Sequence, residues 1–115
     1  MRYIALIYAN EASDPAFDTP ERASMRAEYG TLTQEMVGAN VLSAGAGLQP
    51  TSTATTVRVR DGKTITTDGP FAETREQLGG YYVLECKDLD EAIQWASKMP
   101  TARWGSIEIR PELSM

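Results

Sequence analysis

Asp68 heads the motif Asp68-Gly69-Pro70-Phe71 and is the first candidate for chemistry in this 115-residue chain. It follows an alternating stretch that predicts a strand. A carboxylate at a strand end, beside a cleft and near tyrosines, can serve as a general base. The simpler interpretation is a turn: Asp68 accepts backbone N–H groups, Gly69 permits a sharp bend and Pro70 fixes φ. In that interpretation Phe71 anchors the loop in the core.

Arg58, Arg60, Glu108 and Arg110 form a second group of candidates. Each alternates with apolar neighbours, so all four are expected to point away from the apolar faces of their strands. The planar guanidinium of arginine suits a carboxylate or phosphate ligand. The simpler interpretation is a salt-bridged dimer rim or a solvated edge, where ion pairs are individually weak.

Tyr3, Tyr81 and Tyr82 are the third group, with Tyr81 as the candidate for ligand binding. A tyrosine hydroxyl in a cleft can donate to an oxyanion. More often such residues are core aromatics with a polar tip.

The absence of histidine limits the chemistry. It excludes Ser-His-Asp and Cys-His catalysis and every metal site that contains histidine. Cys86 is the single cysteine, so no disulfide can form within the chain, and it is expected to be an inert buried thiol. We therefore expect no metal and no cofactor.

The formal net charge of −5 argues against nucleic acid as a partner, because there is no basic excess to release counterions. The N-terminal apolar run is short and lacks the pattern of a cleaved leader, so it predicts a first strand rather than a signal peptide or membrane span. The expectation is a cytoplasmic protein without a membrane.

Local signals predict the elements that position these residues. Thr19 caps a helix that begins at Pro20, and Gly38 supplies its left-handed stop. Asp88 and Glu91 form a capping box for a second helix that ends before Pro100. The expected strands cover 2–8, 41–48, 81–86 and 106–110, and a hairpin covers 55–67.

Three further expectations concern packing. Along the first helix Met25, Tyr29, Leu32 and Met36 form one apolar stripe, and Gly30 is expected to mark close packing. Along the second helix the buried stripe is expected to contain Leu89, Ala92, Ile93 and Ala96. In the second strand Ser43, Gly45 and Gly47 are too small to fill space, so another group must approach that face.

The element order is strand-helix-strand, hairpin, strand-helix-strand. It predicts one domain, residues 1–115, of the α+β class: a ferredoxin-like split βαβ plan with an inserted β-hairpin and two helices on one face of an antiparallel sheet. The first and third core strands, expected at the centre, are apolar on both faces. Two helices cover only one face, so a second copy is expected to cover the other in a homodimer.

These motifs, taken together, give a resemblance to the YCII-related proteins, specifically the branch with a DGPF motif. It covers nearly the whole chain and rests on these segments: RYIALIY, GANVLSAGAGLQP, TTVRVRDGK, TDGPFAETREQLGGYYVLE, LDEAIQWASKMP and SIEIRPEL.

The resemblance implies a dimeric α/β barrel, a bacterial source and work beside extracytoplasmic-function sigma factors. It implies no settled reaction for the DGPF branch. Other YCII-like proteins are thought to pair an Asp with a His, whereas here Asp68 has no histidine anywhere in the chain.

Three functions remain open. The first is a small-molecule-binding or regulatory homodimer with its ligand between the sheet and the partner. The second is a cofactor-independent lyase or isomerase that uses Asp68 as base, with an arginine or tyrosine to stabilise the anion. The third is a structural protein-interaction domain.

Overall fold

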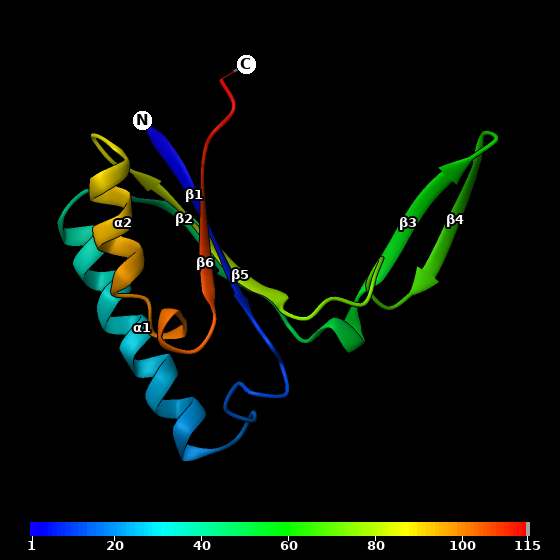
Figure 1. Ribbon diagram of the computed structural model, residues 1–115, viewed down its shortest axis with the longest axis horizontal. Helices are drawn as coiled ribbons and strands as arrows, with labels where there is room; N and C mark the ends of the chain where they lie inside the picture. Colours follow the sequence, from blue (N-terminus) through cyan, green and yellow to red (C-terminus); the bar gives the residue numbers. More distant parts are fainter. Residues whose placement is uncertain (115) are drawn as a thin grey trace.

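The computed structural model describes residues 1–114 and shows an α+β fold with a four-stranded sheet and two helices on one face (Figure 1). The strands are β1 (Arg2–Ala9), β2 (Leu42–Gly47), β5 (Gln77–Glu85) and β6 (Ser106–Pro111). Their order is β2-β5-β1-β6, and every neighbouring pair is antiparallel. The first and third core strands, β1 and β5, therefore lie at the centre, as predicted.

The helices are α1 (Pro20–Gly38) and α2 (Leu89–Ser97), and their predicted starts are confirmed. The side chain of Thr19 accepts a hydrogen bond from Arg22 N, and that of Asp88 accepts one from Glu91 N. The predicted stop at Gly38 is wrong, because Gly38 is still helical and Asn40 adopts the left-handed conformation, with φ of 58°. Asparagine can do this because its short polar side chain tolerates positive φ.

The core lies between the helices and the sheet, with Met36, Leu84 and Met99 fully buried. Within α2 the predicted stripe is half right. Ala92 and Ala96 are buried, but Leu89 and Ile93 are 48% and 47% exposed. The two alanines bring this short helix close to the core, which leaves its longer side chains near the solvent.

The predicted hairpin is confirmed as β3 (Thr55–Arg60) and β4 (Lys63–Asp68), a separate two-stranded sheet. Its turn residues Asp61 and Gly62 have φ of 52° and 74°, as a type I′ turn requires. The hairpin stands away from the rest of the protein, on the side of the sheet opposite the helices (Figure 1).

The face of the sheet away from the helices is uncovered within residues 1–114. The register places Ile4 opposite Val83 and Leu6 opposite Tyr81 on this open face, and all four side chains are half-buried. Both faces of the central strands are therefore apolar, as the sequence indicated. The sheet does not close into a barrel within the chain described.

Two other packing expectations are wrong. A Cβ added at Gly30 would meet nothing within 4 Å, so this glycine marks no close contact. Phe71 does not anchor its loop in the core, because it is 73% exposed. Its loop leaves the base of the hairpin, far from the layer between helices and sheet.

Candidate functional site

The structure divides the residues predicted to bind a ligand between three places. Arg58 and Arg60 lie on the hairpin, where they donate hydrogen bonds to Phe71 O and Val59 O. Glu108 and Arg110 lie on the open face of β6 and pair with each other at 3.2 Å. Tyr81 is in β5. The hairpin arginines and the β6 pair are therefore not brought together within one chain.

Asp68 is the last residue of β4, opposite Thr55, and it is exposed. Among residues 1–114 its carboxylate accepts no hydrogen bond. The turn is held instead by Gly69, whose N–H donates to Ala54 O at 2.7 Å and whose φ is 98°. The interpretation of Asp68 as a turn acceptor is therefore wrong, whereas its role as a base stays a prediction.

A cavity of about 930 Å³ opens between α1 and the sheet, and we call it the α1–β2 cavity. This volume lies within the usual range of small-molecule sites. Four segments line it: 14–17, the inner face of α1, 42–50 and 77–82, together with Ile7, Ala9, Glu11 and Thr101. Of the predicted site residues only Tyr81 is part of this lining.

Small residues create the space. Gly45 and Gly47 of β2 and Gly79 and Gly80 of β5 all line the cavity. At Gly45 an added Cβ would lie 2.7 Å from Cδ1 of Tyr82, so the glycine allows the tyrosine ring to rest on β2. The sequence signal in β2 was therefore meaningful: the group that approaches is Tyr82, and beyond it lies open space.

One stripe of α1 faces the cavity. Arg22, Met25, Arg26, Tyr29 and Thr33 recur at intervals of three and four, so they share one side of the helix. The predicted apolar stripe thus has two roles: its C-terminal part, Leu32 and Met36, is buried in the core, whereas Met25 and Tyr29 line the cavity.

Four hydroxyl groups form two hydrogen-bonded pairs at the inner end of this stripe, and a bond to the backbone of Tyr29 links one pair to the helix. Tyr29 donates to Thr101 Oγ1 at 2.7 Å, and Thr33 donates to Tyr29 O at 2.8 Å. Thr33 Oγ1 also lies 3.0 Å from the hydroxyl of Tyr82. Because a threonine hydroxyl has one proton, Tyr82 is the donor in this last bond, and its own lone pairs remain free to accept.

Burial raises the pKa of Tyr29 above its ordinary value, and the hydrogen bonds with Thr101 oppose this shift. The phenol is therefore neutral at physiological pH, and it acts as a hydrogen-bonding group. The rings of Tyr29 and Tyr82 stack with their centroids 6.4 Å apart, which gives the cavity an aromatic wall.

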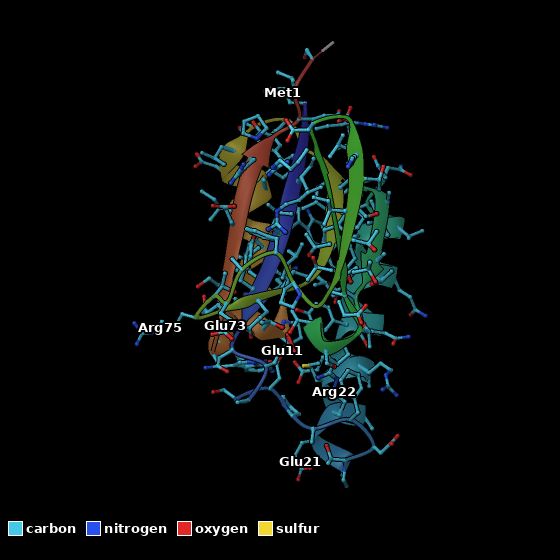
Figure 2. All side chains as sticks on the ribbon, turned by 90° about the vertical axis from the view of Figure 1, so that its right-hand side faces the viewer. Met1, Glu11, Glu21, Arg22, Glu73 and Arg75 are labelled. Atoms are coloured by element: carbon cyan, nitrogen blue, oxygen red, sulfur yellow. The ribbon has the colours of Figure 1, made fainter. Side chains whose placement is uncertain are left out.

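Four charged residues lie along the cavity, and three of them have partners (Figure 2 labels Glu11 and Arg22). Glu11 accepts from Thr51 N at 3.1 and 3.3 Å. Asp14 accepts from the indole N–H of Trp104 at 2.7 Å. Arg22 donates to Pro15 O and lies over the ring of Phe17. Arg26 makes no hydrogen bond or ion pair with any of residues 1–114.

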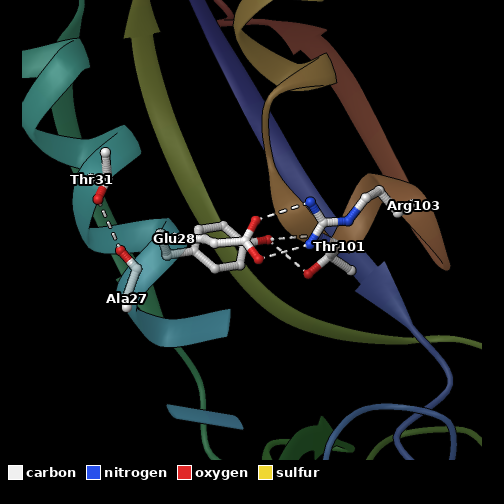
Figure 3. A network of polar contacts seen from close by, with 6 residues as sticks. Ala27, Glu28, Thr31, Thr101 and Arg103 are labelled. Atoms are coloured by element: carbon white, nitrogen blue, oxygen red, sulfur yellow. Dashed lines mark hydrogen bonds and ion pairs between the residues drawn. The ribbon is translucent and has the colours of Figure 1, made fainter. Parts of the chain in front are cut away.

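A bidentate ion pair fastens α1 beside the cavity (Figure 3). The guanidinium of Arg103, in the 3₁₀ helix η2 (Pro100–Arg103), donates to both carboxylate oxygens of Glu28 at 2.9 and 3.0 Å. These hydrogen bonds lower the pKa of Glu28. Glu28 precedes Tyr29 in α1, and Thr101 lies two residues before Arg103 in η2, so the pair joins the same two elements as the bond between Tyr29 and Thr101.

Other kinds of site find no support in the described chain. No helix within residues 1–114 is long and apolar enough to cross a membrane. No three cysteine, aspartate or glutamate residues in the same range gather closely enough to hold a metal ion. The α1–β2 cavity is therefore the main candidate site.

Comparison with known proteins places the chain in a family. The model of the YCII-related domain matches residues 1–114. The chain is also similar to an uncharacterized protein of Rhizobium meliloti (strain 1021), with 39% identity over 113 residues, which cover 96% of this chain and 91% of the relative. The chain therefore belongs to the family of proteins with a YCII-related domain.

Proposed function

We propose that this protein is a small-molecule-binding, regulatory member of the family and that its ligand occupies the α1–β2 cavity. The cavity itself carries the proposal, because its volume of about 930 Å³ is that of a ligand site. Its walls are mostly small or apolar with a few convergent polar groups, which is the usual composition of such sites. The predicted ligand cleft on the open face is thereby replaced by one on the helix side.

The polar groups favour binding over catalysis. The hydroxyl of Tyr29 is held by Thr101 and that of Tyr82 by Thr33, and the raised pKa of Tyr29 keeps its phenol protonated, so it is not available as a base. Glu11 and Asp14 are each held by a donor from the protein. Groups fixed in this way orient a bound molecule, and they keep that geometry without a proton being moved.

A thermal-shift screen with a metabolite library tests the proposal. Compounds that fit the cavity are expected to raise the Tm of the wild type, because a ligand that binds only the folded state stabilises it. Gly47→Phe is expected to abolish these shifts, since Gly47 lines the cavity and an added Cβ there meets nothing within 4 Å.

Gly30→Phe is the matched control, because Gly30 also has open space around it but does not line the cavity. Its ligand-induced shifts should equal those of the wild type. Hits that persist in Gly47→Phe, or a library without any hit, would contradict binding in this cavity.

We further infer the ferredoxin-like plan and a homodimer in which two open faces meet as a dimeric α/β barrel. The central positions of β1 and β5 and the uncovered apolar residues of the open face support this assembly. The same proposal includes membership of the DGPF branch, a cytoplasmic location and work beside a sigma factor. These three parts rest on the resemblance of the sequence.

The other two functions have less support. Asp68 as a general base lies outside the cavity lining, so a lyase or isomerase would need a second, separate site. A protein-interaction domain would use the exposed Val57 and Val59 of the hairpin. In the proposed homodimer a second copy of the chain would cover that apolar surface instead.

A further inference from the structure

We infer that the ligand of the α1–β2 cavity is a hydroxylated aromatic carboxylate, with its carboxylate on Arg26 and its ring over Gly47 of β2, beside the two stacked tyrosines. This inference rests on the proposed function, because it identifies the class of molecule that the same cavity takes. It follows from three properties of the lining: an unpaired cation, a flat floor and a free acceptor.

The unpaired cation is Arg26. Its neighbour Arg22 donates to Pro15 O at 3.0 Å and lies 4.1 Å from the ring centre of Phe17, so its position is fixed. Arg26 has no such partner among residues 1–114. A guanidinium offers a planar fork of donors that matches a carboxylate, and it is therefore the group that an anionic ligand would bind.

The acidic residues of the lining, Glu11 and Asp14, are not free to bind a charged group of the ligand in the same way. Both oxygens of Glu11 accept from Thr51 N, and Asp14 accepts from Trp104 Nε1. Each carboxylate is thus turned to a donor of the protein. The two arginines and two acids balance in formal charge, so the preference for an anion comes from the one group that remains without a partner.

The floor of the cavity is flat. Residues 44–47 are Ala-Gly-Ala-Gly and lie in edge strand β2, with Gly79 and Gly80 behind them in β5. A Cβ added at Gly80 would lie 2.9 Å from Ala46 O, so the two strands approach closely. The bare peptide planes around Gly47, with the rings of Tyr29 and Tyr82 beside them, favour a planar molecule.

The free acceptor is the hydroxyl of Tyr82. Its proton is directed to Thr33 Oγ1, because the proton of Thr33 is used on Tyr29 O. A hydroxyl group on the ligand ring can donate to the remaining lone pairs of Tyr82. A carboxylate at one end and a donor at the other would orient the ring along the cavity.

Isothermal titration with three probes tests the inference: 4-hydroxybenzoate, the neutral 4-hydroxybenzyl alcohol and the non-planar cyclohexanecarboxylate. The wild type should bind 4-hydroxybenzoate at least about tenfold more tightly than either of the others. The alcohol lacks the carboxylate, and cyclohexanecarboxylate lacks both the planar ring and the ring hydroxyl. Arg26→Gln should weaken binding of 4-hydroxybenzoate by about tenfold or more, because the charged hydrogen bonds are lost.

Arg75→Gln is the matched control. Arg75 is exposed in the loop before β5, outside the cavity lining (Figure 2), and the substitution removes the same charge. Its affinity for 4-hydroxybenzoate should equal that of the wild type. Circular dichroism of both variants shows whether each is folded.

Each alternative result of the titrations contradicts a specific part of the inference. Equal affinity for the alcohol, with no effect of Arg26→Gln, overturns the carboxylate. Equal affinity for cyclohexanecarboxylate overturns both the planar ring and its hydroxyl. In both cases loss of binding in Gly47→Phe still supports the proposed function. Absence of binding by all three probes overturns the ligand class, while the library screen judges the cavity separately. Binding that survives Gly47→Phe overturns both, because the probe would then bind outside the α1–β2 cavity.

Discussion

At the scale of single residues, the glycines of β2 separate two physical roles that look the same in the sequence. Gly45 is needed because its missing Cβ makes room for the ring of Tyr82. Gly47 has open space around it, and its small size leaves volume for a ligand. The small residues of β2 predicted that another group approaches this strand. They did not show which glycine contacts a side chain and which borders the cavity, because that depends on the position of α1.

Gly45→Ala is expected to destabilise the protein by about 1–3 kcal/mol, because overpacking forces Tyr82 or the backbone to move. The added Cβ would lie 2.7 Å from Tyr82 Cδ1 and 3.0 Å from Tyr81 O. Urea denaturation followed by circular dichroism measures the change. Gly47→Ala is the control and should stay within about 1 kcal/mol of the wild type; equal losses in the two variants would speak against the close contact.

Cys86 is expected to be unreactive in the folded protein. Its side chain is 2% exposed, and burial, followed by the negative charge of Glu91, raises its pKa. The thiol therefore lacks both access and thiolate character. Mass spectrometry after iodoacetamide treatment should show an unmodified protein under native conditions and one added group in denaturant. Rapid native labelling would mean that the core around Cys86 opens.

At the scale of elements, local chemistry predicted most boundaries. Thr19-Pro20 and Asp61-Gly62 specify a helix start and a tight turn through a few neighbouring bonds, and both appear as expected. β5 begins at Gln77, four residues before the predicted start, because pairing with β1 overrides the low strand preference of Gly79 and Gly80. The cavity depends on how α1 lies against β2, and no local pattern encodes that arrangement.

The ion pair of Glu28 and Arg103 is expected to make stability depend on acid pH. The hydrogen bond from Arg103 lowers the pKa of Glu28 in the folded protein. The contribution of the pair to the free energy of unfolding is therefore present above the unfolded pKa of Glu28, and it is lost as the pH falls through the lower, folded pKa. The difference in stability between the wild type and Glu28→Gln should therefore be seen at neutral pH and disappear in acid. Thermal melts across pH measure it.

Glu73→Gln is the control for this experiment, because Glu73 is exposed in a loop and has no ion pair among residues 1–114. Its stability relative to the wild type should not vary with pH in the same way. A pH-independent loss in Glu28→Gln would assign the effect to helix packing instead of the charge pair.

At the scale of the whole molecule, the chain is extended for its size. Its radius of gyration is 15.9 Å, whereas a compact domain of this length has about 13 Å. The hairpin accounts for the difference, since it projects from the open side of the sheet (Figure 1). An isolated two-stranded hairpin is marginally stable in water, and the proposed second copy would give it a surface to pack on.

Sedimentation equilibrium is expected to show a species of twice the chain mass at micromolar concentration. Leu6→Asp on the open face and Val57→Asp on the hairpin should each shift the protein toward the monomer, because a charge would be buried in the interface. Val37→Asp is the control: Val37 lies on α1 and is 58% exposed, close to the 60% of Val57. A monomeric wild type would remove the basis for the dimeric barrel.

The bond between Trp104 and Asp14 gives the protein an optical signal of its own. Asp14 borders the cavity and accepts the indole N–H of Trp104, so a ligand that enters the cavity changes the polarity around this indole. Trp95, the second tryptophan, lies on α2 beneath Lys98 and outside the lining. A bound ligand should therefore change the fluorescence of Trp104 and leave that of Trp95 unchanged. In the Trp95→Phe variant, the remaining tryptophan fluorescence would report ligand binding without an added label.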